Sequence, residues 1–547
     1  MRAAELFIRC LENEAVDTIF GLPGEENMDV MDALLGSRIR FIGTRHEQGA
    51  AFMADVYGRL TGRAGVCLST LGPGATNLMT GVADANMDHA PVVAITGQAG
   101  LDRMHKESHQ YLDTVSLFHP ITKWNAQIKK ASIIPEVVRK AFKVAQTEKT
   151  GATHIDFPED EAEADAEGTP LRAQFAAPPE PPEEKVVQAA DVISGARHPI
   201  VLAGNGVIRG RASESLRRFA RTLNIPVANT FMAKGVLSLT DPLSLFSVGL
   251  QSRDYVSCGF DRADVVICVG YDLVEYAPRF WNPTGDKKIV HIDMNPAEVD
   301  AAYIVEVGVV GDIAETLDRI AERARPHEDG AIVALRREIV AELHERHRDD
   351  PAFPVMPQRV IAEVRAALGP DDVLISDVGA HKVWVARCYP CYNPNTCIIS
   401  NGFAAMGIAL PGGVAASLLA KRQPGRRVLA LSGDAGFLMN VQELQTAVEH
   451  DLPFVNLVFR DDAYGLIAWK QILKYGRESH VRFRNPDFVK LAESFGCKGY
   501  RVQTADDLGP ILKDALASRV PSVIDCPVDY RENMKLTERL GALVCPV

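Results

Sequence analysis

Short, nearly continuous apolar runs alternate along the chain with amphipathic segments. Apolar runs of this kind, without polar alternation, are typical of strands buried on both faces of a parallel sheet. The amphipathic segments predict helices that connect neighbouring strands by right-handed crossovers. The pattern therefore predicts an α/β protein built from doubly wound parallel sheets. The runs include AGVCLST, VVAIT, PIVLAGN, DVVICVG, IVHID, DVLISD, RVLALSG and FVNLVF.

Two breaks divide this pattern. The segment 172–185, RAQFAAPPEPPEEK, is rich in proline and charge and predicts an extended linker. The segment 325–357 is very polar and predicts a second connection that carries a solvent-facing helix. A chain of 547 residues fits about three domains. The predicted domains are 1–171, 186–325 and 355–530, followed by a C-terminal tail, 531–547.

Composition narrows the class of protein. The net charge of −12 argues against a nucleic-acid partner. No apolar stretch reaches the ~18–20 residues that span a bilayer, and the charged N-terminus resembles no targeting peptide. The ten cysteines are scattered, which favours reduced thiols and a cytoplasmic protein without a membrane partner. A redox or metal role for the single CxxC, Cys388–Cys391, is the minor alternative.

One glycine turn at a strand end holds an aspartate. The run RVLALSG leads into Gly433-Asp434-Ala435-Gly436, and Asp461 follows 27 residues after Asp434, where the run FVNLVF ends. Successive parallel strands end at the same edge of a sheet, which predicts that the two carboxylates lie side by side. Mg²⁺ binds one or two carboxylates together with phosphate oxygens, and a helix start offers N–H groups to a phosphate. The spacing predicts a metal-bridged diphosphate site, with two helix-capping aspartates as the alternative.

Three other features add candidate chemistry. Glu47 lies between a predicted strand, 40–43, and a small-residue helix, 49–59, where it is a cap, a surface group or a partly buried proton shuttle. Gly72-Pro73-Gly74 is a second strand-to-helix turn. The loop 204–206 resembles half of a dinucleotide fingerprint, but its third glycine is misplaced, so a plain tight turn is at least as good an interpretation.

Together these motifs resemble those of the thiamine diphosphate-dependent enzymes. GDAG with RDDAYG resembles their cofactor motif, usually GDG followed by a pair of asparagines, and TRHEQGAAFMADVYGRLTG is similar to their activating-glutamate segment. STLGPGATNLMTGVADA, PVVAITGQ, ISDVGAHKVWVAR and ISNGFAAMGIALPGGVAASLLA extend the resemblance over nearly the whole chain. It is closest to the acetolactate synthases, and within them to the FAD-independent catabolic branch.

The resemblance implies a set of site residues. Thiamine diphosphate and Mg²⁺ are the implied cofactors, and Glu47 is the implied catalytic residue, bound to the pyrimidine ring. Implied metal ligands are Asp434, Asp461 and the carbonyl of Ala463. Implied cofactor contacts are Gly379, Ala380, His381, Ala404, Met406, Gly433, Ala435, Gly436 and Tyr464. Implied substrate contacts are His109, Gln110, Leu466 and Lys470.

The implied reaction decarboxylates pyruvate and joins the remaining two-carbon unit to a second pyruvate, which gives 2-acetolactate and CO₂. Family precedent implies a homo-oligomer, a dimer or tetramer, with the active site between two subunits. Another thiamine-dependent carboligase or decarboxylase of 2-oxo acids, and an FAD-containing biosynthetic acetohydroxyacid synthase, stay open. So do a flavin or nicotinamide redox protein built on Gly204–Gly210 and a non-catalytic homologue.

Departures from the family pattern refine these expectations. Ala435 replaces the usual glycine, which predicts a negative φ at this position. Arg460 and Asp461 replace the asparagine pair. The stretch 270–282, GYDLVEYAPRFWN, lacks the pattern of the flavin-binding members, so FAD is not expected. Lys470 occupies the position of a specificity tryptophan, which leaves open whether the acceptor is pyruvate or 2-ketobutyrate.

Overall fold

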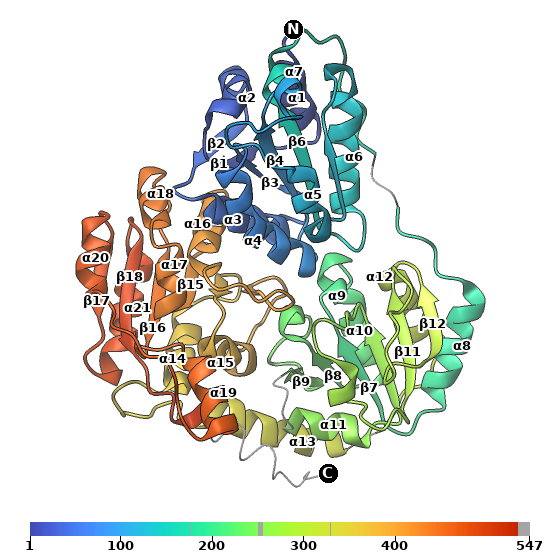
Figure 1. The fold of residues 1–547 in the computed structure, drawn as a ribbon. Helices are drawn as coiled ribbons and strands as arrows, with labels where there is room; N and C mark the ends of the chain where they lie inside the picture. The colour runs from blue at the N-terminus through green and yellow to red at the C-terminus, as the bar shows by residue number, and fades with distance from the viewer. Residues whose placement is uncertain (175–176, 250–254, 329, 534–547) are drawn as a thin grey trace.

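The computed structural model describes residues 1–174, 177–249, 255–328 and 330–533. Three parallel sheets, each of six strands in the described residues, form three lobes that contact one another (Figure 1). Every strand pair within these sheets is parallel, as the continuous apolar runs predict. The predicted α/β class, with three doubly wound sheets, is confirmed.

The first domain holds the order β2-β1-β3-β4-β6-β5. Its strands are β1 (Thr18–Gly21), β2 (Arg40–Gly43), β3 (Gly65–Ser69), β4 (Val92–Gln98), β5 (Trp124–Gln127) and β6 (Ala152–Pro158). Its helices are α1 (Ala3–Asn13), α2 (Met28–Leu34), α3 (Glu47–Thr61), α4 (Pro73–Met87), α5 (Thr114–Phe118), α6 (Ile134–Gln146) and α7 (Glu159–Glu163). The helix predicted over 49–59 thus begins two residues earlier, which places Glu47 in its first turn.

The second domain holds the order β12-β11-β10-β7-β8-β9. Its strands are β7 (Pro199–Ala203), β8 (Val227–Asn229), β9 (Ser244–Ser247), β10 (Val265–Val269), β11 (Lys288–Asp293) and β12 (Val305–Val310). Its helices are α8 (Glu183–Ser194), α9 (Gly206–Arg209), α10 (Ser213–Leu223), α11 (Tyr255–Arg262) and α12 (Ile313–Ala321), and α13 (Ala331–Val340) follows in the connection to the third domain. The short helix α9 opens at Gly206, where the sequence pattern indicates none.

The third domain holds the order β14-β13-β15-β16-β18-β17. Its strands are β13 (Val373–Ser376), β14 (Cys397–Ile399), β15 (Val428–Gly433), β16 (Val455–Arg460), β17 (Lys498–Arg501) and β18 (Ser522–Pro527). Its helices are α14 (Pro357–Ala367), α15 (Ala380–Cys388), α16 (Ala409–Ala420), α17 (Asp434–Met439), α18 (Glu443–Glu449), α19 (Gly465–Tyr475), α20 (Phe488–Ser494) and α21 (Leu508–Ala517). Counted from its own first strand, this sheet repeats the strand order of the first domain.

One hydrophobic core joins the first and third domains. It contains buried residues of α3 and α4 together with residues of α16, α18 and the strands of the third sheet. Gly412 allows α16 to approach α3 closely, because a Cβ there would lie 2.9 Å from Cγ2 of Val56. The two domains are therefore packed as one body, with the elements that carry the candidate site on either side of the contact (Figure 1).

Two findings bear on the cellular setting. In the part of the chain that the structure describes, no helix is both long and apolar enough to cross a membrane. Eight cysteines are buried free thiols, including both members of the CxxC, Cys388 and Cys391. Cys258 takes part in a disulfide bond, so the prediction of reduced thiols is wrong for Cys258.

Candidate active site

The loops that follow β13 and β15, at the carboxyl end of the third sheet, mark a topological switch point. The chain passes from β13 outward to β14 and then returns to the other side of β13 as β15, so the two loops diverge at this point. Ligands of open parallel sheets bind at such switch points. Gly379 and the Gly433–Gly436 turn, both expected from the sequence to contact a diphosphate, lie here together.

The imidazole of His381 packs between these two glycines. A Cβ on Gly379 would lie 2.6 Å from Cε1 of His381, and a Cβ on Gly433 would lie 2.9 Å from the same atom. Burial lowers the pKa of His381 to about 3, so its ring is neutral. Its Nε2 atom is buried without a hydrogen-bond partner in the described residues. A buried polar atom of this kind fits a site that a polar ligand completes.

Asp434 opens α17 and is almost completely buried. Its Oδ2 accepts hydrogen bonds from the amides of Asp461 (3.3 Å) and Asp462 (2.8 Å). The same oxygen accepts a third bond, from Nδ2 of Asn485 (2.8 Å). The loop after β16 is thus folded onto the carboxylate that ends β15, as the spacing of Asp434 and Asp461 predicts.

Ala435 takes the helical conformation in the first turn of α17 and donates its N–H to Oδ1 of Asp434 (2.8 Å). It is not among the residues with positive φ, which confirms the expectation for an alanine at this place. Gly436 follows beside a second buried carboxyl, since a Cβ there would lie 2.5 Å from Oδ2 of Asp377. That oxygen also lacks a hydrogen-bond partner in the described residues.

The Asp461 side chain lies near that of Asp434 without a full counter-charge. Burial first, and then the charge of Asp434, raise the pKa of Asp461 to about 8, and Arg482 offsets this only in part. Two carboxyl groups held this close favour a bound cation. No group of three or more His, Cys, Asp and Glu side chains suited to a metal occurs in the described residues. A metal bound here would therefore need oxygen ligands beyond these two carboxylates.

A cavity of ≈ 440 Å³ opens beside Asp461. Its walls come from α19 and from the segments that flank β16 and β18, including Trp469 and Tyr530. Its lining residues belong to the third domain and to the segments directly before and after it. The cavity thus adjoins Asp461, one of the two carboxylates.

The segment between β14 and α16 carries Ala404 and Met406. Ala404 has a φ of +57° and Gly407 a φ of +96°. Gly407 donates its N–H to Oδ1 of Asp377 (2.7 Å), and its carbonyl accepts from Nδ2 of Asn440 (2.9 Å). The segment is thereby tied to Asp377, after β13, and to Asn440, at the end of α17. The contact of Ala404 and Met406 with a cofactor stays a prediction.

Glu47 is buried in the first turn of α3. Its Oε2 accepts a hydrogen bond from Nδ2 of Asn77 (3.0 Å). Glu443 of the third domain binds the amides of the two preceding residues, Arg45 (3.1 Å) and His46 (3.0 Å). Burial raises the pKa of Glu443 to about 7. The position of Glu47 is therefore set by both domains.

The expected substrate residues lie at several places. His109 and Gln110 are exposed, and Gln110 adjoins the glycine turn of the first domain, since a Cβ on Gly72 would lie 2.5 Å from its carbonyl oxygen. Leu466 and Lys470 lie on α19, and Lys470 is exposed. Tyr464, expected at the cofactor, is 41% exposed and packs its ring against Phe483.

Three polar residues of the site were not predicted from the sequence: Asn485, Asn77 and Asp377. Asn485 bridges Asp434 and Asp462, with Nδ2 2.7 Å from Oδ1 of Asp462. It lies in a loop 51 residues beyond Asp434, with no periodic signal to mark it. Asn77 follows the Gly72–Gly74 turn, and Asp377 comes two residues before Gly379, so a polar residue next to a glycine turn is the usable signal.

Comparison with known proteins agrees with this geometry. The N-terminal thiamine pyrophosphate-binding domain of the thiamine pyrophosphate (diphosphate) enzymes matches residues 1–117, the central domain residues 186–320, and the C-terminal binding domain residues 377–526. An acetolactate synthase of Bacillus subtilis is 37% identical, over 98% of this chain and 94% of that protein. A catabolic acetolactate synthase of Raoultella terrigena is 36% identical, over 98% and 97%. A probable acetolactate synthase large subunit of Methanocaldococcus jannaschii is 37% identical, over 100% and 96%. The chain belongs to the acetolactate synthase family of thiamine pyrophosphate enzymes.

Proposed function

We propose that this protein is an acetolactate synthase that converts two molecules of pyruvate to 2-acetolactate and CO₂. The observation that carries the proposal is the pair Asp434 and Asp461 at the ends of β15 and β16, on the carboxyl edge of the third sheet, in a chain of this family. The test is incubation of the purified protein with pyruvate, Mg²⁺ and thiamine diphosphate. We expect 2-acetolactate, and none when either cofactor is omitted; formation without them would contradict the proposal.

The residues of the switch point fit this cofactor pair. Thiamine diphosphate, when bound, supplies the carbon nucleophile that lets a 2-oxo acid lose CO₂. Asp434, Asp461 and the carbonyl of Ala463 would hold Mg²⁺. The backbone of the Gly379–His381 and Gly433–Gly436 turns would hold the diphosphate. The unpartnered Nε2 of His381 and the raised pKa of Asp461 support this assignment, because a diphosphate–metal pair would satisfy both.

Glu47 would hold and exchange a proton at the pyrimidine ring nitrogen. Its burial in a helix start among small residues keeps water from competing for that proton. Asn77 fixes one of its oxygens and leaves the other for the ring. The carbonyl of Ala404 and the side chain of Met406 would orient the ring from the third domain.

Lys470 and its neighbour Lys382 would set the acceptor preference. The amine of Lys382 donates to the carbonyl of Ser400 (2.9 Å), and burial, with a smaller contribution from Lys470, lowers its pKa to about 8. The amines of Lys382 and Lys470, close enough for their charges to interact, favour an acceptor that carries a carboxylate. His109, Gln110 and Leu466 complete the proposed substrate contacts. Replacing pyruvate as acceptor by 2-ketobutyrate or an aldehyde in the same assay separates this reaction from those of other thiamine-dependent carboligases.

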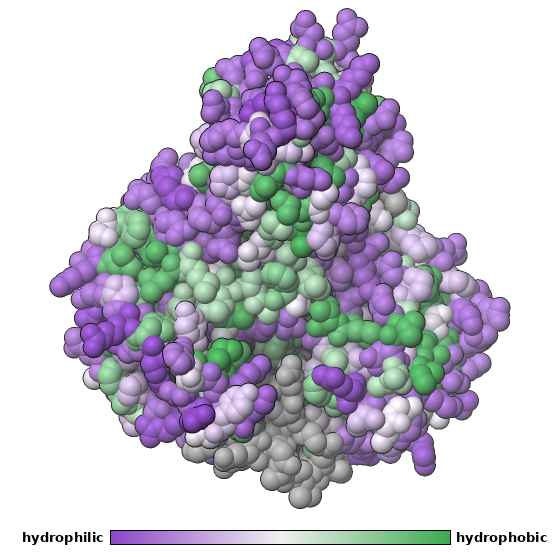
Figure 2. Space-filling view, in the orientation of Figure 1, coloured by the Kyte–Doolittle hydropathy of each residue, from purple (hydrophilic) through white to green (hydrophobic). Residues whose placement is uncertain are grey.

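We infer that the active site is shared between two copies of the chain. The cavity beside Asp461 has walls from the third domain and the segments next to it, whereas Glu47 comes from the first domain. Exposed apolar side chains also lie on α19 and on the segment before α16. Figure 2 shows a band of hydrophobic surface across the middle of the face in view, over parts of all three domains. Analytical ultracentrifugation should give a dimer or tetramer, and a monomer with full activity would exclude a shared site. The exposed apolar side chains of α19 are Ile467, Leu473 and Tyr475, and that of the segment before α16 is Phe403.

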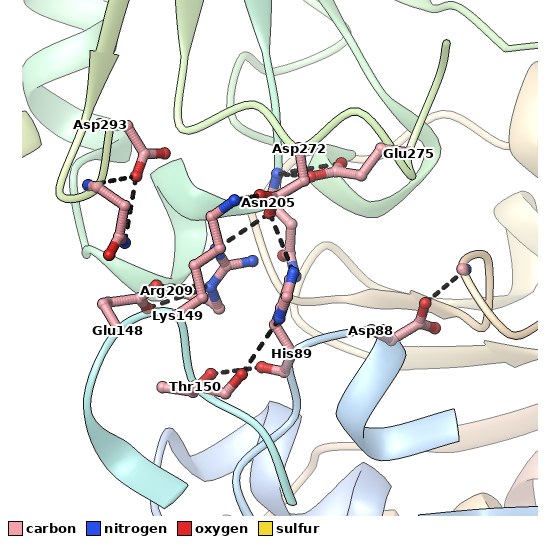
Figure 3. A network of polar contacts seen from close by, with 12 residues as sticks. Asp88, His89, Glu148, Lys149, Thr150, Asn205, Arg209, Asp272, Glu275 and Asp293 are labelled. Carbon is pink, nitrogen blue, oxygen red and sulfur yellow. Dashed lines mark hydrogen bonds and ion pairs between the residues drawn. The ribbon is translucent and has the colours of Figure 1, made fainter. Parts of the chain in front are cut away.

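We further infer that the second domain does not hold FAD. Glu275 accepts the amide of Asn205 (3.0 Å), and the amide of Gly206 bonds to the carbonyl of Gly270 (2.8 Å). The amides that a dinucleotide loop offers to a pyrophosphate are therefore already used. Arg209 lies between Asp272 (3.2 Å) and Glu148 (3.1 Å), so the nearby cation is also paired (Figure 3).

We expect the purified protein to lack the visible absorption spectrum of a flavin. The reason is that Glu275 already accepts the amide of Asn205, so the glycine loop after the second domain's first strand does not offer that amide to a pyrophosphate. Added FAD should leave the rate of acetolactate formation unchanged. One flavin per chain after purification would contradict the inference and favour the biosynthetic branch.

Mg²⁺ affinity should rise with pH. Because the pKa of Asp461 is raised to about 8, its proton is present below that pH and has to leave when the metal binds. We expect apparent affinity to rise about tenfold per pH unit from pH 6 to 8 and then level off. Calorimetric titration with Mg²⁺ at fixed thiamine diphosphate measures this.

The control for the pH experiment is the adjacent, half-exposed Asp462. Asp462→Asn should keep the pH dependence, whereas Asp461→Asn should flatten it. The same slope in Asp461→Asn as in the parent protein would show that another group loses the proton.

We also infer a cytoplasmic setting, which the eight buried free thiols support and the disulfide of Cys258 does not.

A further inference from the structure

A buried ionic cluster lies between the first and third domains. The guanidinium of Arg59 on α3 contacts three carboxylates: Asp55 (2.5 Å), Asp84 (3.2 Å) and Asp88 (3.0 Å). Asp84 and Asp88 come from the end of α4, and each of the three carboxylate residues is at most 1% exposed. One cation cannot balance three buried carboxylates, and burial with mutual repulsion raises the pKa of Asp84.

The remaining acceptor capacity of the cluster is used by the third domain. Asp88 accepts the successive amides of Asn401 (2.9 Å) and Gly402. Asp84 accepts the hydroxyl of Ser400 (2.7 Å) and the amide of Ala405 (3.2 Å) through one oxygen, Oδ1. These four donors all lie in the segment 400–405, which has no regular secondary structure.

Arg59 adds a bond of its own to this segment's start, from Nη1 to the carbonyl of Ile399 (3.3 Å). The fit is close, because a Cβ on Gly402 would lie 2.7 Å from Oδ1 of Asp88 and 3.0 Å from the carbonyl oxygen of Met87. Ala404, in the middle of the segment, has a φ of +57°. A non-glycine residue keeps such a conformation only where its surroundings over-determine it. Here two aspartates of the first domain accept four of the segment's hydrogen bonds, and the amine of Lys382 and the carbonyl of Glu275 add one contact each.

We propose that Asp84 and Asp88, neutralised in part by Arg59, are positioning residues for the cofactor. From the first domain of the same chain they hold segment 400–405 in the shape that presents the carbonyl of Ala404 and the side chain of Met406 to the pyrimidine. They touch only the backbone and Ser400 of that segment. The proposal rests on the proposed thiamine diphosphate site. It adds which residues hold the segment that contains Ala404, with its positive φ, in place.

A merely structural cluster would join the two domains without affecting the ligand. The two roles differ in what an isosteric change does. Asp88→Asn keeps the volume but turns an N–H₂ group toward one of two amides that need an acceptor. A positioning role predicts weaker cofactor binding by a folded protein, whereas a structural role predicts lower stability with unchanged binding.

The first measurement is amide hydrogen exchange of the cofactor-free protein. In Asp88→Asn the amides of Asn401 and Gly402 should exchange about 10–100-fold faster, the range for a lost bond to a charged group. The second is calorimetric binding of thiamine diphosphate at saturating Mg²⁺, without substrate. We expect the Kd to rise about tenfold, because the segment has to be ordered on binding.

Asp264→Asn is the matched control. Asp264 accepts the successive amides of Arg197 (2.9 Å) and His198 (2.8 Å), which reproduces the arrangement at Asp88, but lies in the second domain. Asp264→Asn should speed hydrogen exchange at the amides of Arg197 and His198 and leave the Kd of thiamine diphosphate unchanged. If Asp88→Asn does not fold, Ser400→Ala replaces it, since it removes only the hydroxyl bond to Asp84, and a several-fold rise in Kd is expected.

An unchanged Kd in Asp88→Asn, together with faster exchange at Asn401 and Gly402, would overturn the proposal. For Ser400→Ala an unchanged Kd would do the same. Both measurements are made without pyruvate, so they are independent of the reaction. A protein that binds thiamine diphosphate through this segment but forms no acetolactate would refute the proposed function and leave the positioning role intact.

Discussion

Glu47→Gln is expected to lower kcat for acetolactate formation about 10²–10⁴-fold, the range for loss of a positioned proton donor and acceptor. Glutamine has nearly the same shape, and its side-chain oxygen can still accept the bond from Asn77. The helix start held by Glu443 is untouched. The variant therefore folds and binds cofactor, but it cannot exchange a proton with the pyrimidine. Steady-state kinetics at saturating cofactor, with calorimetric binding of thiamine diphosphate, measure both properties.

A suitable control is Glu26→Gln. Glu26 is also buried in the first domain, where it accepts the hydroxyl of Thr70 (2.9 Å). Its replacement should leave kcat close to that of the parent protein. If Glu47→Gln kept kcat within about tenfold of the parent, the proton-transfer role assigned to Glu47 would be wrong.

Asp434→Asn is expected to have the second large effect. The change removes the negative charge that a metal requires but keeps an oxygen for the amides of Asp461 and Asp462. We expect the Mg²⁺ concentration for half-maximal activity to rise by more than about 100-fold, beyond the loss typical of outer-shell substitutions. The measurement is a Mg²⁺ titration of the initial rate at saturating thiamine diphosphate.

Asp372→Asn controls for the loss of a buried carboxylate from the same domain. Asp372 precedes β13 and accepts the amides of Gly369 (2.6 Å) and Arg427 (2.7 Å). It lies at the amino end of the strand, away from the switch point. Asp372→Asn should lower the free energy of unfolding without changing the Mg²⁺ dependence of the initial rate. Equal shifts in the two variants would argue against a metal at Asp434.

The parts of the site that follow from the sequence are those with a local signal. Apolar runs set the parallel strands, and the distance from Asp434 to Asp461 is one strand–helix repeat, so their meeting follows from the topology. The expected conformation of Ala435 is confirmed because φ depends on that residue's own side chain. The residue limits of the three domains stay predictions.

The parts that could not be predicted depend on contacts between distant segments. Nothing near Gly204–Gly206 indicates that Glu275, 70 residues beyond Asn205, takes the loop's amide. The start of α3 moves to Glu47 because Glu443, about 400 residues away, binds the amides before it. Asp88 in the same way gains its partners more than 300 residues along the chain. Tertiary packing decides such features, and a single sequence carries no periodicity that marks them.

Carbon-13 NMR of the reaction with labelled pyruvate tests the central claim most directly. The purified protein, with Mg²⁺ and thiamine diphosphate, should consume two pyruvates for each 2-acetolactate and each CO₂ formed, and Glu47→Gln should not. Consumption of one pyruvate per CO₂ with acetaldehyde as product, or no consumption at all, would contradict the account.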